Sequence, residues 1–180
     1  MAAGADLKKE IANQEMLLFL IPNQKYSERL RDVAGASAKL FERTCYVSLN
    51  KPYDTLASSF KNDNMDMRKI TFIDCVTQGG KNAPAGQKVV FVSSPSALTD
   101  MSIAINKVID EDKAQSVIFD SLSTLLVYQE PSMVIKFSHS LISKLRAAKV
   151  KGILTCLQDD VKGELVKDLG MFVDKVVELG

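Results

Sequence analysis

The chain has few of the residues that build common catalytic and metal sites. Its 180 residues include one histidine, His139, and three cysteines that lie far apart, Cys45, Cys75 and Cys156. Zinc sites of the usual kind need clustered nitrogen and sulfur ligands, so this spacing excludes them. Each cysteine lies in an apolar run, which predicts buried, reduced thiols. The odd cysteine count and the missing signal peptide indicate a reducing, cytoplasmic location.

Strong charge and long apolar runs are also missing. The formal net charge at pH 7 is +1, which gives no overall electrostatic footprint for nucleic acid or an anionic membrane. No apolar run approaches the roughly 20 residues that a membrane span needs. The length and the 46% hydrophobic content are typical of one globular domain. We expect a short helical N-terminal extension over residues 1–15 and a single domain over residues 16–180.

What is present is an alternation of strand-like and helix-like segments. Apolar and β-branched runs predict strands at residues 16–21, 45–49, 70–76, 89–92, 151–157 and 175–179. The stretch 115–128 predicts a buried strand that delivers Asp120 to the edge of the sheet. Helical spacing predicts helices at residues 5–15, 28–43, 54–60, 101–109, 130–148 and 164–172. Such alternation implies crossover connections, hence a three-layer α/β fold with a mostly parallel central sheet.

Several local features carry more specific expectations. Ser27 is expected to cap the helix over residues 28–43, and Ser96 or Thr99 the helix over residues 101–109, since hydroxyls accept hydrogen bonds from free backbone amides. The first helix is weakly amphipathic, so it either docks a partner or packs on the flank of the domain. The Gly- and Pro-containing loop over residues 78–87 is long enough to be functional or mobile.

Candidate site residues follow from the parallel sheet, because ligands bind beyond the carboxyl ends of such strands. Asp120 is the most interesting of them. It is either a metal-associated carboxylate opposite a phosphate or an aspartate that ends a strand by capping the next turn. His139 falls within a helix and is expected to be a surface residue rather than a base. The full set at the strand ends is Asn23, Gln24, Lys25, Ser27, Asn50, Lys51, Asp74, Asp120, Ser121, Gln158 and Asp159.

A phosphate-binding loop is not evident. Such loops are rich in glycine because backbone amides must curl round the anion. No glycine lies between Gly4 and Gly35, so the first strand-to-helix turn cannot be a G-x-x-x-x-G-K-[ST] loop. The motif Gly79-Gly80-Lys81-Asn82 has Cys75 in place of the first glycine and lacks the hydroxyl residue that the metal requires. The dinucleotide pattern G-x-G-x-x-G is absent as well.

The order of the segments resembles the RecA/KaiC-like ATPases. The segment VIFDSLSTLL resembles the Walker B strand of that family, in which an apolar strand ends in Asp-Ser. CYVSLNKPYDTL, ITFIDCV, VVFVSSPSALTDMSIAINKVI, KGILTCLQ and DLGMFVDKVVEL resemble the family's other strands and helices in the same order. The resemblance covers residues 16–179 and implies a RecA-like P-loop NTPase fold that lacks the P-loop motif.

The resemblance assigns roles to two positions. Asp120 matches the Walker B aspartate, which in active members of the family helps to hold the magnesium ion of bound ATP. Gln158 lies near the sensor position of the family.

Two other positions depart from the family pattern. The segment IPNQKYSER replaces the Walker A loop, so that Lys25 and Ser27 only faintly echo its Lys-Ser/Thr pair. Asn50-Lys51 replaces the catalytic glutamate. Phosphoryl transfer depends on positioning and charge stabilisation, so the resemblance implies a pseudo-ATPase that does not hydrolyse ATP efficiently.

Two functional hypotheses follow. The first is a catalytically inactive RecA/KaiC-like domain that acts as a regulatory or scaffolding protein in signalling or assembly, with protein partners, self-association as a dimer or ring, and no cofactor. The second is an atypical nucleotide-binding protein that holds ATP and magnesium with Lys25, Ser27 and Asp120. An enzyme of unrelated chemistry has no residue constellation behind it. The candidate crevice comprises Lys25, Ser27, Asn50, Lys51, Asp120, Ser121 and Gln158, with Asp120 as the candidate metal ligand.

Overall fold

A computed structural model describes residues 2–78, 83–162 and 164–180. The strands are β1 (Met16–Ile21), β2 (Thr44–Ser48), β3 (Ile70–Asp74), β4 (Lys88–Phe91), β5 (Ser116–Asp120), β6 (Lys151–Leu157) and β7 (Lys175–Glu178). The α-helices are α1 (Ala2–Asn13), α2 (Tyr26–Leu40), α3 (Tyr53–Asn62), α4 (Leu98–Glu111), α5 (Leu122–Tyr128), α6 (Pro131–Ala147) and α7 (Glu164–Leu169). Short 3-10 turns are η1 (Asn23–Lys25), η2 (Met67–Lys69) and η3 (Gln158–Lys162).

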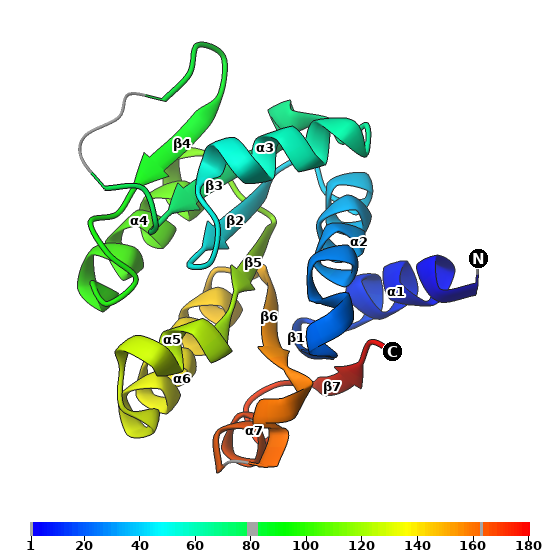
Figure 1. Ribbon diagram of the computed structural model, residues 1–180, viewed down its shortest axis with the longest axis vertical. Coiled ribbons are helices and arrows are strands. Elements are labelled where there is room, and N and C mark those ends of the chain that lie inside the picture. Colours follow the sequence, from blue (N-terminus) through cyan, green and yellow to red (C-terminus); the bar gives the residue numbers. More distant parts are fainter. Residues whose placement is uncertain (1, 79–82, 163) are drawn as a thin grey trace.

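The strands form one parallel sheet in the order β4-β3-β2-β5-β6-β1-β7 (Figure 1). The three-layer α/β fold expected from the sequence is therefore confirmed. β1 pairs with β6 on one side and β7 on the other, so both of its edges are hydrogen-bonded, and all six of its residues are buried. Its unbroken apolar sequence MLLFLI is typical of such an interior strand.

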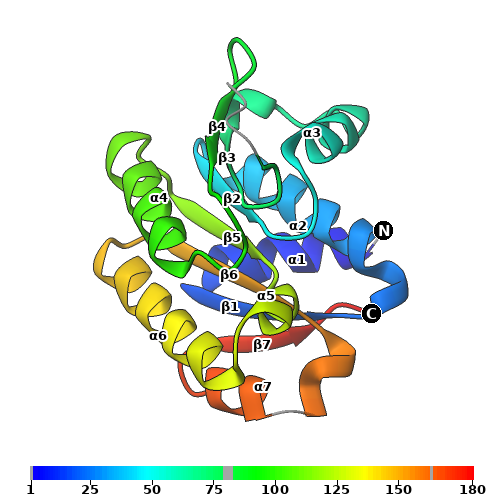
Figure 2. The same cartoon turned by 60° about the vertical axis from the view of Figure 1, so that its left-hand side comes forward.

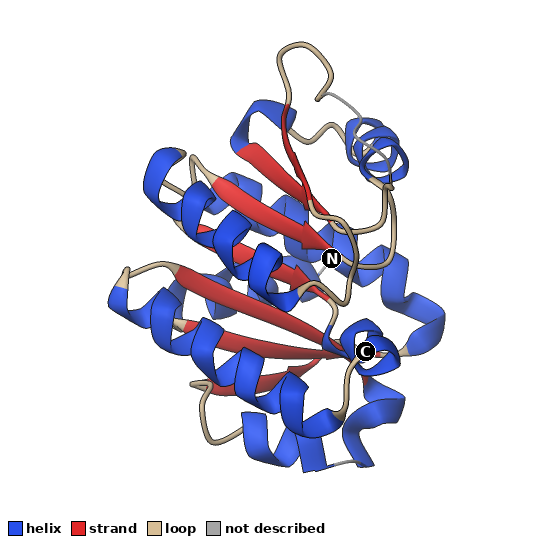
Figure 3. Cartoon of the chain, turned by 90° about the vertical axis from the view of Figure 1, so that its left-hand side faces the viewer, coloured by secondary structure: helices blue, strands red, loops and turns tan. Residues whose placement is uncertain are grey.

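Each face of the sheet is covered by its own set of helices (Figure 2). Helices α1, α2 and α3 pack on one face, and α4, α5, α6 and α7 pack on the other, with the strands between them (Figure 3). Successive side chains of a strand point to opposite faces, so Leu18 joins one apolar cluster while Leu17 and Phe19 join the other. The sheet thus separates two hydrophobic cores, each of which is formed with a different set of helices.

The stretch after Asp120 is a correction to the sequence prediction. The strand β5 ends at Asp120, and the residues that follow form the helix α5 instead of prolonging the strand. The Ser121 hydroxyl accepts a hydrogen bond from the backbone amide of Thr124 at 3.2 Å and so caps the helix. Leu122 and Leu125 are buried on one helical face. A short apolar run fits a strand or a helix equally well, and the cap decides between them.

Both N-cap predictions are wrong. The turn η1 runs directly into α2, so the helix begins at Tyr26, and Ser27 lies inside its first turn. The N-cap of α4 is Ala97, which makes no side-chain cap hydrogen bond, so neither Ser96 nor Thr99 caps this helix. Helix ends were also misjudged, because α2 stops at residue 40 and α7 at residue 169.

Other expectations can be compared directly with the structure. The three cysteines are free and buried, as predicted. Within the described residues, no helix is both long enough and apolar enough to cross a membrane. The predicted loop over residues 78–87 connects β3 to β4, but residues 79–82, and with them the Gly79-Gly80-Lys81-Asn82 motif, lie outside the described part of the chain.

The N-terminal helix α1 packs on the flank of the domain, which is one of the arrangements expected from its sequence. Leu7 and Ile11 are buried in the cluster formed by α2 and the adjoining face of the sheet. The Lys151 ammonium donates to the carbonyl oxygens of Ala12 at 2.9 Å and Gln14 at 2.7 Å, where helix carbonyls lack partners. The extension is therefore held by both apolar and polar contacts.

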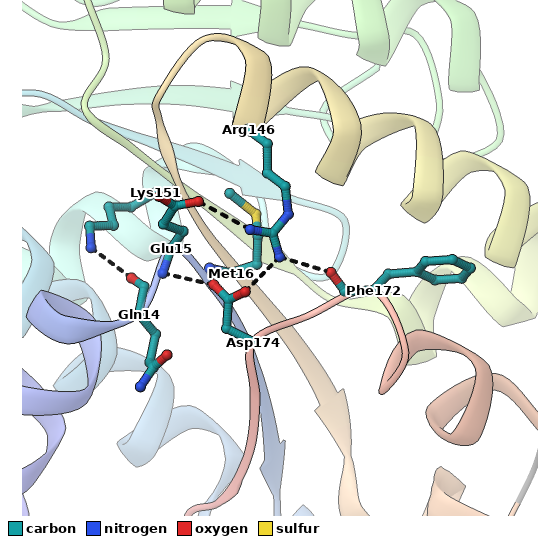
Figure 4. A network of polar contacts seen from close by, with 7 residues as sticks. All are labelled: Gln14, Glu15, Met16, Arg146, Lys151, Phe172 and Asp174. Carbon is teal, nitrogen blue, oxygen red and sulfur yellow. Dashed lines mark hydrogen bonds and ion pairs between the residues drawn. The ribbon is translucent and has the colours of Figure 1, made fainter.

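A polar clamp at the opposite end of the sheet from Asp120 joins the start of β1 to α6 and β7 (Figure 4). One carboxylate oxygen of Asp174 accepts from the backbone amides of Glu15 at 3.0 Å and Met16 at 2.8 Å. The other accepts from Arg146 at 2.7 Å, and Arg146 also donates to the carbonyl oxygen of Phe172 at 3.1 Å. Partial burial opposes ionisation, but the bonds from Arg146 and the two amides hold the pKa of Asp174 below its usual value.

We predict that Asp174→Asn lowers the free energy of unfolding at pH 7 by about 1.5–3 kcal/mol, because it removes charge-assisted hydrogen bonds. The pKa of Asp174 is lowered by folding, so its contribution is present above the unfolded pKa and is lost as pH falls through the folded pKa. Urea unfolding of both proteins at a series of pH values should show their difference shrinking below about pH 4. The exposed Asp110→Asn is the control, and a difference that does not depend on pH would contradict the prediction.

A second prediction concerns Lys149, the second residue after the end of α6. Lys149 has a φ angle of +56° in a turn whose amides return to the carbonyls of Arg146 and Leu145. This left-handed conformation strains any residue with a β-carbon, so Lys149→Gly should raise the free energy of unfolding by about 0.5–1 kcal/mol. Lys144→Gly, inside the same helix, should lower it by about 1 kcal/mol. Thermal unfolding measures both, and a loss in both variants would refute the proposed strain.

Candidate functional site

A cavity of about 590 Å³ opens at the carboxyl ends of β1, β2, β5 and β6. Its walls come from the β1–α2 connection, the turn between β2 and α3, the helix α5 and the end of β6. A larger groove of about 1200 Å³ lies elsewhere, between α1, α2 and the C-terminal residues, and contains none of the predicted site residues. The smaller cavity is therefore the candidate site, since it lies where parallel sheets bind ligands.

The Asp120 carboxylate lies at the base of this cavity and is fully buried. Its Oδ1 atom accepts hydrogen bonds from the Tyr26 hydroxyl at 2.7 Å and the Asn50 amide at 2.8 Å. Its Oδ2 atom accepts from the Tyr46 hydroxyl at 2.8 Å. Both oxygens are thus engaged by neutral donors from α2, from β2 and from the turn after β2.

The register of the sheet explains how these groups meet. Ser48 pairs with Asp120 across β2 and β5, and Tyr46 pairs with Ile118. Tyr46 is two residues from Ser48, so its side chain lies on the same face as that of Asp120. Tyr26 approaches from the first turn of α2, and its hydroxyl lies 3.1 Å from Thr155 Oγ1 on β6.

Burial dominates the electrostatics of this group. It raises the pKa of Asp120 above its usual value, while hydrogen bonds from both tyrosines and Asn50 and the nearby charge of Lys51 act in the opposite direction. The pKa values of Tyr26 and Tyr46 are also raised, first by burial and then by the Asp120 charge. Both tyrosines therefore stay protonated and keep donating to the carboxylate.

A second set of hydrogen bonds connects α5 to the turn after β2, next to Asp120. The Thr124 hydroxyl on α5 donates to Asn50 Oδ1 and lies 3.0 Å from Ser121 Oγ. Asn50 therefore links the turn after β2 both to Asp120 and to the start of α5. The peptide bond between Asp120 and Ser121 is cis.

Lys51 is the single cation in the cavity wall that the structure describes. Its ammonium group donates to Ser27 Oγ at 2.9 Å and forms no ion pair with any described residue. Asp160, beyond the end of β6, is the second acidic residue of the lining.

Asp74 shows the contrasting role of an aspartate at a strand end. It ends β3 and accepts from the backbone amides of Tyr53, Val76 and Thr77 at 2.8–2.9 Å. Burial opposes its ionisation, but these hydrogen bonds, together with that from the Thr77 hydroxyl, lower its pKa. Asp74 therefore fastens a turn and lies outside the cavity lining.

The structure brings most of the sequence-predicted site residues together. Those that line the cavity are Asn23, Ser27, Asn50, Lys51, Asp120 and Ser121. The other residues predicted at the strand ends do not line it, namely Gln24, Lys25, Asp74, Gln158 and Asp159. Lys25 is exposed at the end of η1, and Gln158 begins η3. In the described part of the chain, no three side chains of His, Cys, Asp or Glu gather to hold a metal ion.

Sequence reasoning missed Tyr26, Tyr46 and Thr124. A tyrosine inside a buried strand needs a partner for its hydroxyl, so Tyr46 carried a detectable signal. The identity of that partner depends on the register between β2 and β5, which the sequence does not show. Asp160 was also missed, because its role depends on the path of the chain after β6.

Comparison with known proteins places the chain in a family. A family model described as a family of unknown function, DUF7504, matches residues 22–179. The chain belongs to the DUF7504 family. A search of curated proteins finds no match. The crystal structure of KaiC-like protein PH0186 from the hyperthermophilic archaeon Pyrococcus horikoshii OT3 is similar, with a TM-score of 0.67 and 14% sequence identity over 92% of this chain and 70% of that one. This likeness confirms the RecA/KaiC-like fold of this DUF7504 protein.

The Asp120 network of this DUF7504 protein predicts a specific stability effect. Tyr46→Phe should lower the free energy of unfolding by about 1.5–3 kcal/mol, because one oxygen of a buried carboxylate loses its donor. Urea unfolding at pH 7 measures the loss. Tyr128→Phe is the matched control, since its hydroxyl is half-exposed and makes no hydrogen bond with the described residues.

The same loss should become smaller in an Asp120→Asn background, because the two residues act as a pair. Equal effects of Tyr46→Phe in both backgrounds would show that the hydroxyl acts independently of Asp120.

Proposed function

We propose that this DUF7504 protein is a RecA/KaiC-like domain that does not hydrolyse ATP and that acts as a regulatory or scaffolding protein through contacts with other proteins. The observation that carries the proposal is the state of Asp120. A magnesium ion needs carboxylate oxygens with lone pairs directed toward it. Here three neutral donors occupy those oxygens.

The position of Tyr26 strengthens the argument. A phosphate and its metal would have to lie between the start of the helix after β1 and the carboxylate at the end of β5. In this chain the Tyr26 hydroxyl, from the first turn of α2, is within 2.7 Å of Asp120. The two elements are joined directly, so a metal-bound phosphate would have to displace the tyrosine from a buried carboxylate.

The groups that would handle the phosphate are also missing. The connection Pro22–Lys25 contains no glycine, and Lys25 is exposed and does not belong to the cavity lining. The Asn50 amide, at the end of β2, donates a hydrogen bond to Asp120 and has no basic group to activate water. Positioning and charge stabilisation of phosphoryl transfer are therefore both weakened.

Exposed apolar side chains support an interaction role. Tyr128 at the end of α5 and Met133 at the start of α6 are 49% and 43% exposed. Tyrosine and methionine are enriched in protein interfaces, where one partner covers such groups. Tyr128 directly follows Val127 of the cavity lining, so a partner that covers Tyr128 would come close to the edge at which parallel sheets bind ligands.

Nucleotide binding without hydrolysis is the second candidate. The observation that favours it is the cavity itself, in which Lys51 and Ser27 lie together at the start of α2. In this alternative the phosphate charge would meet Lys51 at the helix N-terminus. Lys25, which the sequence suggested for this role, is outside the lining.

Calorimetry and phosphate-release assays separate the candidates. With ATP or GTP at millimolar concentration, with and without magnesium, we expect no magnesium-dependent binding and no hydrolysis above buffer. Asp120→Asn should leave these results unchanged. Magnesium-dependent binding that Asp120→Asn abolishes would overturn the proposal. Binding that Asp120→Asn leaves intact and Lys51→Met removes would establish the second candidate.

The interaction role needs its own test. Affinity capture from the source cell identifies partner proteins, and each is then tested for binding in purified form. The double variant Tyr128→Ser, Met133→Ser should no longer bind the partner. Sedimentation equilibrium tests self-association. A monomer at high concentration would exclude the dimer or ring.

A further inference from the structure

We propose that the cavity at the carboxyl ends of β1, β2, β5 and β6 binds a small monocarboxylic acid with an apolar body. Cavities of about 300–1000 Å³ with mainly apolar walls and a few polar groups are typical sites for small molecules. The cavity of about 590 Å³ fits this range. A binding site for a small acid goes beyond an interaction role. It rests on the proposed function in one respect, namely that no magnesium nucleotide occupies the cavity.

The walls specify the body of the ligand. Leu30 on α2 and Leu157 at the end of β6 line the cavity, and the Tyr26 ring adds an aromatic surface. Val127 on α5 also belongs to the lining and is 78% exposed. An apolar ligand would remove part of Val127 from water and would contact the leucines, so burial of apolar surface favours binding.

The charges specify the polar end. Lys51 is the single described cation of the lining, and among the described residues its ammonium donates only to Ser27 Oγ. An ammonium group has three N–H donors, so it has donors left for a ligand anion. A single carboxylate matches this single charge. A polyphosphate would meet too little positive charge here, and the repulsion from Asp120 and Asp160, which any anion feels, grows with the number of negative charges on the ligand.

The Asp120 network determines where the carboxylate of the ligand lies. The oxygens of Asp120 accept three hydrogen bonds from protein donors, and an ionised carboxylate has no proton to donate, so Asp120 cannot hold the carboxylate of a ligand. The Lys51–Ser27 pair carries the positive charge of the described lining and is therefore the group that best attracts an anion. The ligand is therefore oriented with its carboxylate at the Lys51–Ser27 side and its apolar body between Leu30, Leu157 and Val127.

Two-dimensional ¹H–¹⁵N NMR titration of the full chain tests the inference with defined probes. The probes are phenylacetate, 3-phenylpropionate, indole-3-acetate and octanoate, each beside its primary amide, with acetate as the carboxylate that has no apolar body. We expect saturable shifts of the Ser27, Lys51, Thr124 and Val127 amides with at least one acid. Its amide and acetate should bind about tenfold more weakly or worse, since each lacks one of the two contacts.

Variants assign the contact to Lys51. Lys51→Met should weaken binding of the acid about tenfold, while Lys51→Arg should retain most of the binding. Lys136→Met, an exposed lysine on α6 outside the cavity, should have no effect. The dispersion of the same spectra shows whether each variant is folded. Val127→Ser should also weaken binding of the acid.

Three results would overturn the inference: no saturable shift with any acid, equal binding of an acid and its amide, or no loss in Lys51→Met. None of them would affect the expected absence of magnesium-nucleotide binding. Conversely, magnesium-dependent ATP binding would refute the proposed function even if a carboxylic acid also binds, so the two failures are distinguishable.

Discussion

The buried carboxylate of Asp120 sets the constraint on which this end of the molecule depends. An ionised carboxylate without partners is unstable in a protein interior, so its oxygens must be met by donors. Tyr46 on β2 donates to one oxygen, while Tyr26 on α2 and Asn50 in the turn after β2 donate to the other. The hydrogen bonds to this one carboxylate therefore join β5 to α2 and to β2 with its following turn, three segments that are far apart in the chain.

That arrangement also governs what the cavity can do. In a parallel sheet the strand ends present their side chains to a common crevice, and a free carboxylate there favours a metal ion. Here Tyr26, Tyr46 and Asn50 hold the Asp120 carboxylate, while Lys51 and Asp160 are the other charged residues of the described lining. The carboxylate that would favour a metal ion is thus engaged by protein donors, and Lys51 is the group of the described lining that can attract an anion.

The fold could be predicted from the sequence because its signals are local and repeated. Runs such as MLLFLI and KGILTCL are long enough to identify buried strands, and their alternation with helices determines a parallel sheet. The failures were local as well. The run after Asp120 is apolar in either a strand or a helix, and only the Ser121 cap distinguishes them. Helix starts depend on preceding turns such as η1, which hydrophobic periodicity does not detect.

The site was less predictable than the fold because its contacts join distant segments. The rule for strand ends identified six residues that meet in one cavity, Asn23, Ser27, Asn50, Lys51, Asp120 and Ser121. It could not identify Tyr46, because a residue inside a strand reaches the site only through its register with β5. The strand β5 ends at Asp120 and Ser121 follows it, which is the pair that resembles a Walker B ending. Whether its carboxylate faces a metal or a tyrosine depends on side chains that lie 94 and 74 residues away in the sequence. Likeness of fold therefore locates the crevice, and the partners of Asp120 decide its chemistry.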